Sequence, residues 1–103
     1  MMKNSETVEI PAPEQIESAA ESLSMISDPS RLKIFWALCL GELCIVDIIK
    51  LTGLSRPSVS HHLRILKTYG LISVRRKGRV IYYRKSSSEK AGVLYGMMLG
   101  AQA

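Results

Sequence analysis

The stretch LTGLSRPSVSHHLRILKTYGLISVRRKGRVIYYRK, residues 51–85, holds the order of elements that decides the fold. Gly53 ends a short helix of roughly eight residues, and after a tight turn Ser55 caps a second helix over residues 56–69. Two helices joined by a turn of about three to four residues that contains glycine form a helix-turn-helix pattern. The sequence therefore predicts this motif in the second half of the chain.

A basic β-hairpin is predicted directly after the second helix. Two runs rich in β-forming residues, 72–76 and 80–84, flank the pair Lys77-Gly78. Helix, turn, helix and basic hairpin is the element order of a winged helix-turn-helix. We therefore expect a mainly α fold with a β-hairpin wing, of class α+β.

Two further helices are predicted before this unit. The segment SDPSRLKIFWAL, residues 27–38, begins a helix because Asp28 can cap free amides and Pro29 suits the first helical position. Apolar residues at helical spacing predict an amphipathic helix at about residues 14–27. Residues 1–13 have little apolar periodicity and are expected to form a flexible arm.

The last predicted helix, at about residues 88–100, completes a single domain over residues 14–103 and carries glycines at four-residue intervals, Gly92, Gly96 and Gly100. Each glycine inside a helix costs about 1 kcal/mol relative to alanine, so a close helix contact is needed to compensate. We expect this helix to pack on its own copy or on the first helix of a partner chain. The protein would then be a homodimer through its first and last helices, with a frayed tail as the alternative.

The two halves of the chain differ sharply in charge. Residues 1–47 carry three Lys and Arg against eight acids, whereas residues 48–103 carry eleven Lys and Arg against Glu89 alone. A charge of one sign over half a small domain indicates a polyanionic partner, and nucleic acid is the partner that we expect. A basic face that serves only solubility is the alternative interpretation.

The sequence also predicts where the protein acts. No apolar run approaches the roughly 18 residues of a membrane span, and the start of the chain lacks the pattern of a signal peptide. Two cysteines, Cys39 and Cys44, are too few for the disulfide framework of a secreted scaffold. We expect a cytoplasmic protein with reduced thiols and no membrane partner.

The adjacent histidines His61 and His62 do not form a catalytic or metal-binding motif. Consecutive helical residues point about 100° apart, and zinc-binding pairs prefer a spacing of i, i+4. No nucleophile is arranged locally with a histidine and an acid, and no Gly-rich phosphate loop is present. We predict that the protein is not an enzyme, that His62 is a partly buried packing residue, and that His61 lies on the outer side of the helix.

The outer side of the second helix carries hydroxyl, imidazole and cationic donors that suit DNA. A helix in the major groove reads base edges with its N-terminal residues, while later Lys and Arg hold phosphates. The basic hairpin suits the minor groove or flanking phosphates. The predicted DNA-binding residues are Ser55, Arg56, Ser58, Ser60, His61, Arg64 and Lys67 of the helix, with Arg75, Arg76, Lys77 and Arg79 of the hairpin.

Four linked segments, SDPSRLKIFWAL, GELCIVDI, LSRPSVSHHLRILKTYGLI and RRKGRVIYYR, make the chain over about residues 23–85 resemble the ArsR/SmtB family of small dimeric transcriptional repressors. The resemblance implies a homodimer with a winged helix-turn-helix in each subunit. It also implies sequence-specific binding to an inverted repeat in double-stranded DNA, repression of transcription, and release from the operator by an effector.

The resemblance also names candidate residues for the effector site, because family members often sense metals or metalloids. Cys44 and Asp47 match two positions that ligate metal in some relatives, while Val46 stands where arsenic and cadmium sensors often have a second cysteine. One hypothesis is therefore a metal or metalloid ion bound by Cys44 and Asp47, with Cys39 from either chain.

Other interpretations of these cysteines and of the basic surface stay open at this point. Cys39 and Cys44 are the only thiols, and their oxidation or persulfide linkage is a second hypothesis for the switch. Cys44 as a small buried residue is the third, and the effector is then an unidentified organic ligand. For the domain as a whole, the alternatives are a nonspecific architectural DNA-binding protein and a protein-binding module with no DNA role.

Overall fold

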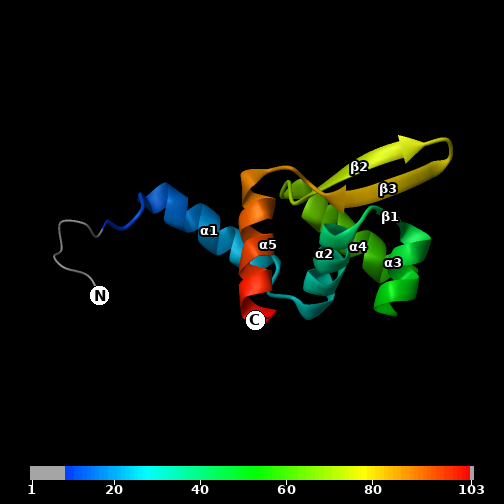
Figure 1. The fold of residues 1–103 in the computed structure, drawn as a ribbon, viewed down its shortest axis with the longest axis horizontal. Coiled ribbons are helices and arrows are strands. Elements are labelled where there is room, and N and C mark those ends of the chain that lie inside the picture. Colours follow the sequence, from blue (N-terminus) through cyan, green and yellow to red (C-terminus); the bar gives the residue numbers. More distant parts are fainter. Residues whose placement is uncertain (1–8, 103) are drawn as a thin grey trace.

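The computed structural model describes residues 9–102 and has the predicted mainly α fold with a β-hairpin wing (Figure 1). Its elements, in chain order, are α1 (Pro13–Met25), α2 (Pro29–Leu40), β1 (Leu43–Cys44), α3 (Ile45–Thr52), α4 (Arg56–Thr68), β2 (Ile72–Lys77), β3 (Val80–Lys85) and α5 (Glu89–Gln102). The first eight residues of the predicted arm, 1–8, lie outside the described residues.

Side chains close to the helix ends set where α2 and α4 begin. The Asp28 carboxylate accepts a hydrogen bond from the amide of Arg31 at 3.0 Å, and the Ser55 hydroxyl accepts one from the amide of Ser58 at 3.2 Å. Both caps satisfy amides that the first helical turn leaves free. Gly53 ends α3 with φ of 72°, in the left-handed region that glycine enters at little cost. The predicted helix-turn-helix is therefore confirmed.

One apolar core joins α2, α3, α4 and α5. Helix α4 turns one face inward, and Val59 and Leu66 are completely buried there. This inward face fixes the helix, so its opposite face is presented to solvent in a defined orientation. The buried core consists of Ile26, Ile34, Phe35, Leu38, Ile48, Val59, Leu63, Leu66, Leu71, Ile72, Ala91, Leu94 and Met98.

The antiparallel sheet has the strand order β1-β3-β2. The sequence did not predict β1, which pairs Leu43 with Tyr83 and Cys44 with Tyr82. The predicted hairpin is confirmed, and each of its strands is one residue longer than predicted, because Lys77 pairs with Val80 and Lys85 with Ile72, so the turn lies at residues 78–79. Gly78 has φ of 63°, and this left-handed conformation places the glycine within the turn itself.

Helices α1 and α5 lie together at the end of the molecule away from the wing (Figure 1). Helix α5 continues to Gln102, beyond the predicted end at about residue 100. A Cβ atom built on Gly92, Gly96 or Gly100 would meet no heavy atom within 4 Å, so the chain does not itself provide the close contact expected at these glycines. Among the described residues, no helix has the length and apolar character needed to cross a membrane.

Candidate nucleic-acid interface

Helix α4 separates a buried apolar face from an exposed polar face. Val59, His62, Leu63 and Leu66 are buried, as the helical spacing predicts. Most of the predicted DNA-binding residues of this helix are exposed and two serines are half-buried. The exposed residues are Ser55, Arg56, His61, Arg64 and Lys67, and the half-buried ones are Ser58 and Ser60.

The two histidines lie in different environments, with their ring centroids 5.4 Å apart in an edge-on arrangement. His62 is 7% exposed, which agrees with its predicted packing role. Burial lowers the pKa of His62 below the ordinary imidazole value, while the nearby Asp28 carboxylate acts in the opposite direction. The neutral imidazole is therefore favoured at this position, and His61 is the histidine whose ring is available to a ligand.

A groove of about 250 Å³ separates α4 from the wing. Arg64 and Lys67 line it from the helix, and Val74, Ile81 and Tyr83 line it from the strands. Apolar strand residues thus face the helix across the groove, next to two cations. Its full lining is Ile45, Ser60, Leu63, Arg64, Lys67, Val74, Ile81 and Tyr83.

The register of the hairpin divides the wing cations between two faces. Residues that are directly opposite on neighbouring strands share a face, and alternate residues along a strand point to opposite faces. Since Val74 pairs with Tyr83 and Arg76 with Ile81, Arg76 belongs to the face that looks toward α4. Arg75 pairs with Tyr82 and Lys77 with Val80, so these two cations belong to the other face.

The wing cations also differ in what they bind within the chain. The Nε atom of Arg76 donates to the carbonyl oxygen of Gly78 at 3.1 Å, across the turn. Arg79, within the turn, makes no side-chain hydrogen bond or ion pair with the described residues, and neither does Lys77 at the end of β2. These two are therefore the wing cations most free to meet a phosphate.

Arg75 is held by Glu42, a residue that the sequence analysis did not select. Its Nε donates to Oε2 of Glu42 at 3.0 Å, and its Nη2 donates to Oε1 at 2.6 Å. The bound guanidinium lowers the pKa of the Glu42 carboxyl, and the carboxylate raises the pKa of Arg75. The sequence gives no signal for this pair, because Glu42 lies 33 residues before Arg75 and its position does not identify the cation that it meets.

The two cysteines are free and half-buried in the structure. The Sγ atom of Cys44, just before α3, donates to Oδ2 of Asp47 at 3.2 Å. Burial raises the pKa of the Cys39 thiol to about 11, although the nearby Lys85 acts in the opposite direction. Cys39 is therefore a protonated, weakly nucleophilic thiol.

The described residues do not fit a metal ion well. They contain no group of three or more His, Cys, Asp and Glu side chains that could hold a metal. Cys44 and Asp47 supply two donors, whereas zinc and related thiolate sites use about three or four protein ligands. The chain as described therefore offers half of a metal site at this position.

Comparisons with known proteins identify the family to which this fold and this surface belong. The model of the bacterial regulatory proteins of the arsR family matches residues 28–74, from the start of α2 into β2. An uncharacterized HTH-type transcriptional regulator of Methanocaldococcus jannaschii is 38% identical over 71 residues, which are 68% of this chain and 80% of that regulator. The chain belongs to the ArsR family.

Solved structures show the extent of the likeness between this ArsR-family chain and other proteins. The crystal structure of NolR from Sinorhizobium fredii is similar with 33% identity and a TM-score of 0.73, over 88% of this chain and 93% of NolR. The transcriptional repressor BigR from Xylella fastidiosa is similar with 25% identity and a TM-score of 0.76, over 87% of this chain and 92% of BigR. The winged fold thus extends over nearly the whole chain.

Curated relatives of this ArsR-family chain include regulators of transcription that are longer than the matched part. The transcriptional repressor SmtB homolog of Synechocystis sp. is 41% identical over 75 residues, which cover 73% of this chain and 57% of that repressor. The cadmium resistance transcriptional regulatory protein CadC homolog of Staphylococcus aureus is 40% identical over 65 residues, which cover 62% of this chain and 54% of that regulator. The chain thus spans little more than half the length of these two relatives. Their names agree with the prediction that the chain is not an enzyme.

Proposed function

We propose that the protein is a transcriptional repressor that binds a specific inverted repeat in double-stranded DNA as a homodimer. The observation that carries the proposal is the exposed polar face of α4, which stands beside a basic wing and is held in place by a buried apolar face. A rigid helix with varied donors suits the major groove, and a basic hairpin suits the flanking backbone. Membership of the ArsR family supports the same function. We propose that it acts in the cytoplasm.

The proposed contacts divide into base contacts and phosphate contacts. The N-terminal part of α4 faces base edges, and cations farther along the helix and on the wing hold phosphates. Specificity then depends on the first group, and the salt dependence of binding depends on the second. The base group is Ser55, Arg56, Ser58, Ser60 and His61, and the phosphate group is Arg64, Lys67, Arg76, Lys77 and Arg79.

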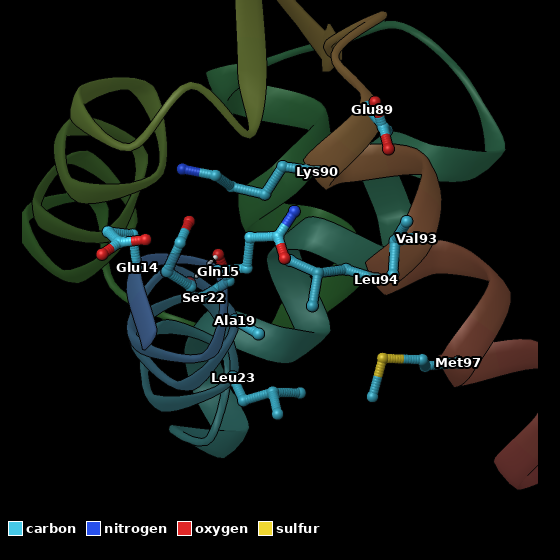
Figure 2. Close-up of a pocket in the computed structure, with 11 residues that line it drawn as sticks. Glu14, Gln15, Ala19, Ser22, Leu23, Glu89, Lys90, Val93, Leu94 and Met97 are labelled. Atoms are coloured by element: carbon cyan, nitrogen blue, oxygen red, sulfur yellow. Dashed lines mark hydrogen bonds between the residues drawn. The ribbon is translucent and has the colours of Figure 1, made fainter. Parts of the chain in front are cut away.

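The proposed dimer forms through α1 and α5, as the sequence analysis expects. A groove of about 500 Å³ lies between these helices, and Figure 2 shows Leu23 and Met97 on its two sides. Leu23 is 43% exposed and Met97 is 49% exposed, so both lose apolar surface to water when a partner helix covers the groove. The glycine side of α5 is open to a close approach by that helix.

Release from DNA is proposed to follow a change near the junction of α2 and α3, where Cys39, Cys44 and Asp47 lie. The effector classes are a metal or metalloid ion, an agent that oxidises or persulfurates a thiol, and an organic ligand. The experiment adds As(III), Cd(II), Zn(II), a persulfide donor and an oxidant in turn to the reduced, metal-free complex with DNA. If Cys44→Ser abolishes the response to one of them, the cysteine is the sensor, and if none of the five releases the DNA, the effector is an organic ligand.

The test of the DNA-binding proposal is a footprint of the reduced protein on the DNA upstream of its own coding sequence. We expect protection of two half-sites about 34 Å apart, one helical turn of DNA, with one subunit on each. Sedimentation of the free protein should give the mass of two chains. Uniform protection of all DNA would indicate an architectural protein, and no protection at any salt concentration would indicate a protein-binding module.

A further inference from the structure

The wing carries an ion pair in which one of its cations is already engaged within the chain. Arg75 lies on the face of the hairpin opposite the groove that separates α4 from the wing. Both oxygens of Glu42 accept hydrogen bonds from it, at 3.0 and 2.6 Å. Within the described part of the chain this is the only ion pair. The guanidinium also lies over the ring of Tyr82, 5.3 Å from its centroid, so two neighbours fix its orientation.

Glu42 lies where it can control the angle of the wing. It follows Gly41, which ends α2, and precedes the two residues of β1 that pair with β3. That pairing ends at Cys44 and Tyr82, and the rest of the hairpin extends beyond it. The ion pair adds a side-chain connection at the last paired position, because Arg75 lies opposite Tyr82. Helix α2 is thereby attached to the wing at the point where the hairpin leaves the body.

An acid at this place would by itself weaken DNA binding. Glu42 belongs to the acidic half of the sequence, yet it lies among Arg75, Arg84 and Lys85 at the base of the wing. A carboxylate near a DNA surface repels phosphates, so its presence calls for a compensating role. A planar guanidinium held by two hydrogen bonds along one edge has a fixed geometry, which a single point charge does not give.

We propose that Glu42 and Arg75 are positioning residues that set the wing at the angle in which Arg76 and Arg79 reach DNA. Arg75 in this account contacts Glu42 and Tyr82, and it does not contact phosphate. The inference rests on the proposed DNA-binding function and changes the role of one predicted DNA-binding residue. The competing account has Arg75 as a phosphate ligand that Glu42 withholds from DNA.

The test measures affinity for the upstream duplex between about 50 and 200 mM salt, where each lost phosphate contact lowers the salt slope by about 0.9. The variants are Arg75→Gln, Arg75→Lys and the charge-swapped double variant Glu42→Arg/Arg75→Glu, of which the last two keep the net charge of the wild type. Arg79→Gln serves as the matched wing variant that removes a phosphate contact. Hydrogen exchange of amides 72–85 in the free protein reports whether the wing has loosened.

The positioning account predicts that Arg75→Gln and Arg75→Lys weaken binding about threefold with an unchanged salt slope, since exposed ion pairs contribute modestly. The charge-swapped variant should recover the affinity and the wing exchange rates of the wild type. The account is overturned if Arg75→Gln lowers the slope as Arg79→Gln does, or if the charge-swapped variant binds as weakly as Arg75→Gln. A wild type that binds no duplex in a salt-dependent manner instead refutes the proposed function itself.

Discussion

Replacement of Arg79 by alanine tests whether the wing tip holds phosphates. Arg79 is exposed and makes no side-chain contact with a described acid, so its loss removes a charge without breaking an internal ion pair. Each contact with a phosphate contributes about 0.9 to the slope of log affinity against log salt. A dimer loses two such contacts, which lowers the slope by about 1.8. Between about 50 and 200 mM salt, the wild type should therefore lose affinity about twelvefold more than Arg79→Ala does.

The assay is fluorescence anisotropy of a labelled upstream duplex at four or more salt concentrations, with a scrambled duplex measured in parallel. The matched control is Lys33→Ala, which removes the same charge from an exposed position of α2, outside both α4 and the wing. Arg79→Ala should weaken both duplexes alike, whereas Lys33→Ala should keep the wild-type slope. Equal slopes for all three proteins would refute the assignment of Arg79 to a phosphate. A loss confined to one duplex would refute its assignment to the backbone.

Three further predictions concern α4. Arg56→Ala should reduce the binding free energy for the operator by about 1 to 3 kcal/mol and relax the preference at one base pair, as measured by competition with single-base operator variants. An equal loss of affinity for every duplex would contradict a base contact. Leu66→Ala, at a fully buried site, should lower the free energy of unfolding in urea by about 2 to 5 kcal/mol at fixed protein concentration, whereas Leu51→Ala, at a position 65% exposed, should change it by less than about 0.5 kcal/mol. Burial lowers the pKa of His62 in the folded protein, so the unfolded chain binds a proton at this histidine more readily than the folded one does. The free energy of unfolding should therefore fall as the pH drops below about 6.5, the ordinary pKa of histidine. In urea unfolding at several pH values, His62→Gln should reduce this loss of stability at low pH, whereas His61→Gln should leave it as in the wild type. If the pH dependence of stability in His62→Gln equals that of the wild type, His62 is not the cause of the loss.

The elements that the sequence predicted well are those fixed by neighbours along the chain. Asp28 and Ser55 each cap an amide three residues away, and Gly53 needs only its own left-handed conformation. The inward position of His62 follows from helical period alone. Local signals of this kind need no knowledge of the tertiary structure.

The features that the sequence missed depend on contacts between distant segments. Strand β1 has two residues and exists because β3 pairs with it, 38 to 40 residues farther along the chain. Arg75 and Glu42 are 33 residues apart, and only the register of the hairpin shows that Arg75 and Arg76 face opposite ways. The sequence alone predicted all four cations around the turn as DNA-binding residues, without distinguishing between them. The glycines of α5 meet no close neighbour among the described residues, although their spacing predicted a close helix contact.

The most direct test of the central claim is the ratio of affinities for the upstream operator and for a scrambled duplex of equal length and composition. It is measured by competition, with reduced and metal-free protein at one salt concentration near physiological. Specific regulators bind their sites at least about a thousandfold more tightly than random DNA. The account predicts a ratio in that range, which falls in Arg56→Ala and is unchanged in Arg79→Ala. A ratio near one, with tight binding to both duplexes, would contradict sequence-specific repression and indicate an architectural DNA-binding protein.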